Sequence, residues 1–232
     1  MMKQLNISLY SLLIQSFFDK EAIQTIRPGA LLFQEKDPVN HIYILLQGSV
    51  ALGRQHVNGK EFILKILNGE ELIIEYQLFK PSPHYHFFAK ALSYCEVLTV
   101  NRVEFEEFVK NDSFLLQSLT AWLSTRYLKS QMKCQDLIMN GKKGGLYSVL
   151  IRLCHSYGMI TKDGILIDLP LTHQELANLT FGTREVIQRI LKELREKDII
   201  SYEQQKFTIK NLDYLKKEVD CQNCPYEICG LN

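Results

Sequence analysis

Three cysteines stand close together near the end of the chain, at Cys221, Cys224 and Cys229. The sequence holds only six cysteines in 232 residues, so three within nine positions are far more than an even distribution would place there. Thiolates are ligands of zinc and of iron–sulfur clusters, and a short segment with C-x2-C-x4-C spacing can supply three of them. The residues therefore predict a metal centre, either structural zinc or an iron–sulfur cluster, with a group of free thiols as the remaining alternative.

A second group of residues has the types and the spacing of a DNA-reading element. Thr172 and Glu175 can form a capping box at the start of one helix, and Thr183 can cap a second helix after a short turn that contains Gly182. Two short helices joined by such a turn are typical of a helix-turn-helix. The apolar face of the second helix is expected to consist of Val186, Ile187, Ile190, Leu191 and Leu194.

The opposite face of this second helix carries Arg184, Glu185, Gln188 and Arg189. They fall in the first turns, which are the part of a recognition helix that enters the major groove. Arginine suits O6 and N7 of guanine, and glutamate can accept a hydrogen bond from N4 of cytosine. An ordinary amphipathic helix with solvated charges is the alternative, but two caps, a turn and base-reading side chains coincide here. The residues therefore predict binding to double-stranded DNA.

The elements that must position these residues change in character along the chain. Apolar residues at helical spacing mark 1–25, and short β-type runs separated by Gly and Pro mark 27–103. Asn58-Gly59 and Asn68-Gly69 each stand between two apolar runs, which is the sequence signal of a hairpin. Many short strands at regular spacing predict a small barrel or a double sheet. The strands are expected at 30–33, 42–46, 50–52, 62–67, 87–92 and 96–100.

A long helix is predicted over 112–140, because this stretch contains neither Pro nor Gly and Gly141 offers a stop. A helix of about 42 Å is typical of a spine between two domains or of a dimer seam, with a core helix as the alternative. The apolar residues at helical spacing are Leu115, Leu119, Trp122, Leu123 and Met132. Beyond the helix, wing strands are expected at 199–202 and 206–209, and a closing helix at 211–219.

The composition sets the outer limits of what the protein can be. Apolar residues make up 46% of the chain, charged residues 23%, and the net charge is +1, so a folded protein is expected whose DNA binding depends on a local motif. No apolar run approaches the roughly 20 residues of a membrane span, and the start of the chain lacks the apolar region of a signal peptide. We therefore expect a cytoplasmic protein with reduced thiols and no membrane partner. No group of residues has the arrangement of a catalytic site, so an enzyme is not expected.

Taken in order, these elements resemble the CRP/FNR family of bacterial transcription regulators. The matching segments are Arg27-Pro-Gly-Ala-Leu-Leu-Phe33, Ile42-Tyr-Ile-Leu-Leu-Gln-Gly-Ser-Val50, Asn68-Gly-Glu-Glu71 and Arg184-Glu185-x-x-x-Arg189. The resemblance covers nearly the whole chain and implies an α+β fold, with an N-terminal double-stranded β-roll (a cyclic-nucleotide-binding-like jelly roll), a long dimerisation helix and a C-terminal winged helix-turn-helix. The implied boundaries are 1–111, 112–140 and 141–220, followed by a cysteine-bearing tail at 221–232.

The resemblance also implies partners for these parts. It implies a homodimer on a near-palindromic DNA site with TGTGA-like half-sites, and RNA polymerase as a further partner. Members of the family that bind cyclic nucleotides hold the phosphate with an Arg-Ser pair late in the roll, and alignment on Cys95-Glu96-Val97 places this pair at Tyr85-His86. A neutral phenol and an imidazole cannot supply the bidentate charge that arginine gives a phosphate, so cAMP is not expected as the effector.

The terminal cysteines resemble those of the branch of the family found in Gram-positive bacilli, which has the same C-x2-C-x4-C spacing at its C terminus. The enterobacterial branch carries its cluster cysteines mainly at the N terminus, whereas no cysteine precedes Cys95 here. The resemblance implies one [4Fe–4S] cluster per subunit, oxygen sensing and control of anaerobic genes. It implies Asp136 as the fourth ligand, with Cys134 as a softer rival two residues away. A structural zinc combined with an unknown small-molecule effector is the alternative function.

Overall fold

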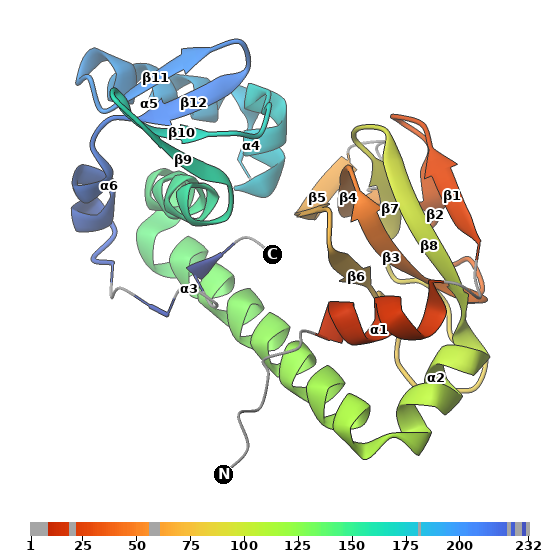
Figure 1. Ribbon diagram of the computed structural model, residues 1–232. Coiled ribbons are helices and arrows are strands. Elements are labelled where there is room, and N and C mark those ends of the chain that lie inside the picture. Colours follow the sequence, from red (N-terminus) through yellow and green to blue (C-terminus); the bar gives the residue numbers. More distant parts are fainter. Residues whose placement is uncertain are drawn as a thin grey trace. The chain divides into compact units, whose positions relative to one another are not determined.

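Figure 1 shows the computed structural model of the chain, which describes residues 9–18, 22–55, 61–180, 182–221, 224–225 and 229–230. The chain divides into two compact units, Met1–Ser124 and Thr125–Asn232. Strands make up most of the first unit, whereas the second combines helices with a small sheet (Figure 1). In the described part of the chain, no helix is both long and apolar enough to span a membrane.

The first unit is a roll of two four-stranded antiparallel sheets. One sheet has the strand order β1 (Ile23–Ile26), β8 (Cys95–Asn101), β3 (His41–Gln47) and β6 (Glu71–Ile73). The other has the order β2 (Leu31–Phe33), β7 (Phe88–Ala91), β4 (Ser49–Gln55) and β5 (Glu61–Asn68). Alternate side chains of both sheets enter one apolar core, in which Ile42, Leu67 and Leu98 are fully buried. The predicted β-roll is confirmed.

The chain crosses between the two sheets at Gly48 and again at Gly69. Strands β3 and β4 lie in different sheets, and so do β5 and β6. The backbone amide of Gly69 donates a hydrogen bond of 3.0 Å to the carbonyl of Gly48, so the two crossings lie side by side. The prediction of a hairpin at Asn68-Gly69 is therefore wrong, because this turn joins strands of different sheets. The hairpin predicted at Asn58-Gly59 falls outside the described residues.

Substitution of Gly48 by alanine is expected to destabilise the first unit by roughly 2–5 kcal/mol. Gly48 has a φ of +95°, and a Cβ atom there would lie 2.3 Å from the carbonyl oxygen of Tyr94. Gly29→Ala is the matched control, because Gly29 has a φ of +82° but no neighbour within 4 Å of the added atom. Backbone strain alone then costs about 1–2 kcal/mol. Urea unfolding of both variants checks this, and equal losses would show that the contact with Tyr94 relaxes.

Each of the six predicted β-type runs overlaps a strand, but two strands of the first unit were not predicted. Helical spacing predicted a helix across 1–25, whereas α1 covers Leu9–Phe17 and Ile23–Ile26 forms β1. All four residues of β1 pair with β8, and this tertiary pairing overrides the local spacing. The three-residue strand β6 was also missed, because so short a segment shows no alternation.

Helix α2 (Arg102–Asn111) follows the roll and was not predicted as a separate element. The side chain of Asn101 caps it by accepting hydrogen bonds from the amides of Val103 and Glu104. Phe105 and Val109 on this helix are buried in the roll core. Helix α2 therefore belongs to the first unit, which continues into the long helix as far as Ser124.

Helix α3 (Ser113–Tyr157) consists of two helical segments that meet at a kink. Asp112 caps the first segment by accepting hydrogen bonds from two backbone amides of its first turn. At Gly141 the backbone leaves the helical region, with φ 59° and ψ −164°. A positive φ is easily adopted by glycine, so the first segment stops at the residue that the sequence predicted.

The apolar residues of the first α3 segment do not all share one environment. Leu115 and Leu119, whose spacing helped to predict the helix, are buried in the roll core. Other apolar side chains of the segment are exposed, among them Leu116, Leu123 and Tyr127. The exposed set, rather than Leu115 and Leu119, is available to a partner subunit.

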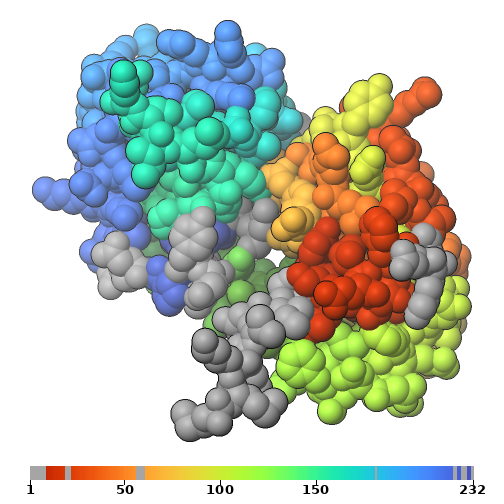
Figure 2. Space-filling view, viewed as in Figure 1, coloured from red at the N-terminus to blue at the C-terminus, as the bar shows by residue number. Residues whose placement is uncertain are grey.

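The second unit contains the predicted winged helix-turn-helix. Its helices after α3 are α4 (His173–Leu179), α5 (Arg184–Glu196) and α6 (Leu212–Glu218). Its sheet has the order β11 (Ile200–Glu203), β12 (Lys206–Ile209), β10 (Gly164–Ile167) and β9 (Gly158–Thr161). The hairpin of β9 and β10 was not predicted, because the residues of β9 are all exposed and give no alternating pattern. Figure 2 shows the atoms of this hairpin, in green-blue, on the surface of the second unit.

Candidate functional site

Helices α4 and α5 are held in place by the caps that the sequence predicts. Thr172 and Glu175 form a capping box, in which the amide of Thr172 donates a hydrogen bond of 2.6 Å to the Glu175 carboxylate. The hydroxyl of Thr183 accepts a hydrogen bond from the amide of Val186 at the start of α5. The side chains that anchor α5 to the core of the unit are Ile187, Ile190, Leu191 and Leu194. Local sequence thus fixes where α5 begins and which face it buries.

The opposite face of α5 presents the residues predicted to read DNA. Arg184, Glu185, Gln188 and Arg189 are all exposed and lie in the first turns of the helix. Donors and acceptors at the start of a capped, anchored helix can reach base edges in the major groove. The structure therefore gathers the four predicted residues on one exposed face.

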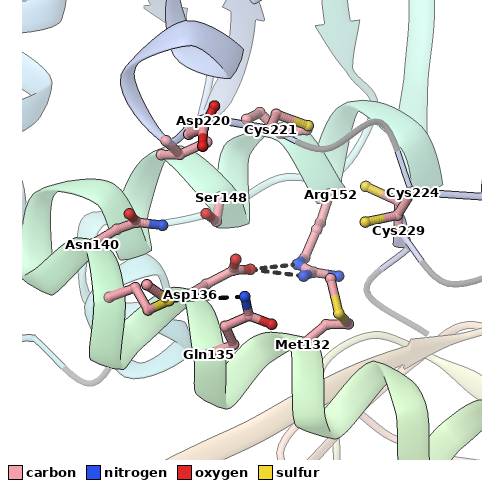
Figure 3. A pocket seen from close by; sticks show the side chains of 13 residues that line it. Met132, Gln135, Asp136, Asn140, Ser148, Arg152, Asp220, Cys221, Cys224 and Cys229 are labelled. Carbon is pink, nitrogen blue, oxygen red and sulfur yellow. Dashed lines mark hydrogen bonds and ion pairs between the residues drawn. The ribbon is translucent and has the colours of Figure 1, made fainter.

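A cavity of about 290 Å³ lies within the second unit and brings the predicted metal ligands together. Asp136 lines it from the last turns of the first α3 segment, and Cys221, Cys224 and Cys229 line it from the chain after α6. In Figure 3, Cys224 and Cys229 lie together on one side of the pocket, and Cys221 lies next to Asp220 on another wall. Cys134 is exposed and is not among the lining residues.

Backbone turns bring these distant parts of the chain to one pocket. The kink of α3 lets its second segment pack closely against the first, since a Cβ atom on Gly145 would lie 3.0 Å from Leu137. The amide of Cys221 donates a hydrogen bond of 2.9 Å to the carbonyl of Lys216. This bond ties the first residue of the tail to the last turn of α6. The amide of Cys229 donates to the carbonyl of Pro225, also at 2.9 Å.

Asp136 does not face the pocket alone, because Arg152 on the second α3 segment binds it. Nη2 and Nε of Arg152 donate hydrogen bonds of 2.7 and 3.3 Å to the same carboxylate oxygen, Oδ2 (Figure 3). The Arg152 side chain is only 8% exposed and that of Asp136 22%. Charges so far from water require a partner, so this ion pair is a fixed part of the pocket. Arg152 was not predicted as a site residue, because nothing in the neighbouring sequence marks it.

Charge also couples Cys229 to its neighbours in the pocket. Burial raises the pKa of the Cys229 thiol, and the positive charge of Arg152 opposes that rise. Negative charge on Cys221, Cys224 and Asp136 raises the pKa further. These groups are therefore close enough to influence one another, and Arg152 favours the thiolate form of Cys229.

Cys154 provides a contrast, because it is buried in the second α3 segment and does not line the pocket. Burial raises its pKa to about 12, with Lys216 opposing the shift. A thiol in such surroundings stays protonated and is a poor ligand and nucleophile. Cys154 is therefore a core residue.

The donor atoms of the pocket suit a soft metal centre. Three thiols and one carboxylate match the ligand types of a zinc site or of an iron–sulfur cluster. Within the ranges that the structure describes, no three His, Cys, Asp or Glu side chains lie close enough to one another to hold a metal ion. The pocket therefore has the donor types that such a centre needs. To bind the same metal centre, its side chains would have to move closer together.

Comparisons with known proteins agree with this architecture. The sequence of residues 23–112 matches the family model of the cyclic nucleotide-binding domain. Residues 146–218 match the family model of the Crp-like helix-turn-helix domain. The anaerobic regulatory protein of Bacillus subtilis is 38% identical over 202 residues, which cover 87% of this chain and 85% of that protein. The global nitrogen regulator of Nostoc sp. is 31% identical over 190 residues, covering 81% of this chain and 84% of that protein.

Solved structures show the same fold. A mutant of CooA from Carboxydothermus hydrogenoformans has a TM-score of 0.77 at 19% identity, and the match covers 93% of this chain and 97% of that chain. The order of β-roll, long helix and winged helix-turn-helix is shared. Proteins with this combination of domains are DNA-binding regulators that act as dimers, not enzymes. The chain belongs to the CRP/FNR family of transcription regulators.

Proposed function

We propose that this protein is an oxygen-responsive regulator of anaerobic genes, which binds DNA when Cys221, Cys224, Cys229 and Asp136 hold a [4Fe–4S] cluster. The observation that carries this proposal is that these four residues, from two distant parts of the chain, line one cavity. The similarity to an anaerobic regulatory protein supports it. The exposure of Cys134 outside the cavity favours Asp136 as the fourth ligand.

The cluster would supply an oxygen-labile link between the tail and α3. The tail follows α6, which closes the winged helix-turn-helix, whereas Asp136 belongs to the α3 segment before the kink. Ligands from both sides hold the winged helix-turn-helix in one orientation on this segment. In a homodimer joined along α3, that orientation determines the separation of the two recognition helices, which must be about 34 Å to enter adjacent major grooves. Release of the tail frees the orientation, and specific binding weakens.

We further propose α5 as the recognition helix for a near-palindromic site with TGTGA-like half-sites. Arg184 and Arg189 are assigned to guanine, and Glu185 to cytosine N4. Gln188 lies on the same exposed face and completes the contact surface. RNA polymerase is the expected partner at the promoter.

The β-roll is not proposed to bind cAMP, because the position expected to hold its phosphate is built into the core. Tyr85 is 4% exposed and stacks on Phe33 with ring centroids 3.8 Å apart. Its hydroxyl donates a hydrogen bond of 2.5 Å to the carbonyl of His41. A side chain held in this way cannot turn to a phosphate, so the signal is proposed to enter through the cluster.

The metal and sulfide content of protein purified without oxygen tests this function. The proposal predicts about four iron and four sulfide per chain, and a brown colour that fades in air. Zinc without sulfide would instead favour the alternative, a regulator with a structural zinc and a small-molecule effector. Protein that contains neither iron with sulfide nor zinc would contradict both.

The protein is expected to remain a dimer in air. The exposed apolar side chains of α3, including Leu116, Leu123 and Tyr127, do not depend on the tail for their arrangement. Light scattering during size exclusion, with and without oxygen, should therefore give the mass of two chains in both cases. A monomer in air would contradict this prediction and indicate that oxygen acts through dissociation.

A further inference from the structure

Arg152 differs from the other residues of the cavity in its charge and is almost completely buried. Of the described residues that line it, Arg152 is the only basic one, and it shares the cavity with Asp136, Asp220 and the three cysteines. Its side chain is 8% exposed, which is unusual for arginine unless a specific role or partner keeps it there.

The hydrogen bonds of Arg152 leave part of Asp136 available. The two that it donates to Asp136 both end on Oδ2, at 2.7 and 3.3 Å, and neither uses Oδ1. A carboxylate can therefore accept from Arg152 on one oxygen while it binds a metal with the other. Carboxylate ligands of metals are commonly oriented by a second group in this way, and loss of that group typically costs about 10–100-fold in metal affinity.

The positive charge of Arg152 can also offset the negative charges of the proposed ligands. Three thiolates and one carboxylate bring four negative charges to a pocket that is partly shielded from water, and they repel one another strongly there. The positive charge of Arg152 is paired with Asp136 at 2.7 Å, and Arg152 lines the same cavity as Cys229. These two residues come from the opposite sides of the site that a bound group must join.

We propose that Arg152 is a positioning residue of this site: it orients the Asp136 carboxylate through Oδ2 and offsets the negative charge of the thiolate ligands. This inference rests on the proposed function. It assigns a role to a residue outside the ligand set, and it implies that the cation must stay next to Asp136 when the site is filled.

The test uses the full chain, reconstituted without oxygen with ferrous iron and sulfide. Arg152→Met removes the charge and the two hydrogen bonds to Asp136, Arg152→Lys keeps the charge, and Lys143→Met is the control. Lys143 lies on the same α3 segment and pairs with Glu193 at 3.6 Å, but it is exposed and does not line the cavity. Iron retention is measured by competition with a chelator, and the reduction potential by titration followed in visible absorbance.

Arg152→Met is expected to retain iron about 10–100-fold less well than the wild type. Its reduction potential should fall, because the added electron is no longer offset by a nearby positive charge. Arg152→Lys should recover most of the potential and part of the retention, and Lys143→Met should match the wild type in both. A purely structural role for Arg152 would lower the melting temperature without moving the potential.

Wild-type retention and potential in a folded Arg152→Met variant would overturn the proposal while leaving the proposed function intact. If Arg152→Met does not fold by circular dichroism, Arg152→Lys is compared with Arg152→Gln, and equal iron retention in these two variants overturns the role of the charge. A wild-type chain that takes up no iron and sulfide overturns the proposed function, and this inference with it.

Discussion

Without oxygen, Asp136→Ala is expected to lose specific DNA binding, whereas Cys134→Ser retains it. Asp136 lines the cavity with the three tail cysteines, and Cys134 is exposed outside it. Residues two apart on a helix do not face the same way, so Cys134 cannot replace Asp136 without rotation of the helix. Specific affinities typically exceed non-specific ones by 10³-fold or more, so operator affinity should fall by about 10³-fold. Anaerobic fluorescence anisotropy, with iron analysis of the same samples, measures this.

A third variant, Asp136→Cys, separates loss of the link from loss of the fold. A thiolate is a softer and stronger partner for cluster iron than a carboxylate, so this variant should keep the cluster and respond less to oxygen. Normal DNA binding and a full iron load in Asp136→Ala, together with their loss in Cys134→Ser, would identify Cys134 as the fourth ligand. Tail variants without Cys221, Cys224 and Cys229 that still bind the operator at wild-type affinity would refute cluster control altogether.

Arg184→Ala and Arg189→Ala are each expected to cost about 1–3 kcal/mol in binding to the operator and to relax selectivity at one guanine. Both side chains are exposed at the start of α5, where a bidentate contact with O6 and N7 of guanine is possible. Loss of that contact removes the preference for guanine over the other bases. Binding to a panel of operators with single base changes measures the effect.

Arg195→Ala is the matched control for these variants. Arg195 is also exposed on α5, but it lies in the last turn, away from the part of a recognition helix that enters the groove. Its replacement should leave base preference unchanged. If Arg184→Ala or Arg189→Ala weakened binding to all sequences by the same factor, that arginine would contact the phosphate backbone instead of a base.

Local signals in the sequence were sufficient to predict the helix-turn-helix. The capping box of Thr172 and Glu175, the cap at Thr183 and the apolar face of α5 all depend on residues within one or two turns of one another. Each of these signals specifies both a boundary and an orientation, so the exposed face of α5 was predicted residue by residue. The terminal cysteines were equally visible, because their spacing alone is unusual.

The features that depend on contacts between distant segments could not be predicted in this way. Strand β1 is defined by pairing with β8, and the turn at Gly69 by its neighbour Gly48, although each sequence signal favoured another structure. Arg152 is the clearest case. It stands sixteen residues after Asp136 with apolar residues on either side of it in the sequence, and only the kink at Gly141 brings the two side chains together.

The ion pair across the kink has a consequence for how this region can vary in length. An added or deleted residue turns the following part of a helix by about 100°. One such change between Asp136 and Arg152 would therefore carry the guanidinium to another side of α3 and leave two charges without their partners. A Cβ atom added to Gly141 itself would have no neighbour within 4 Å, so substitution there meets only backbone strain. Position 141 should thus accept a change of residue type far more readily than an insertion or deletion.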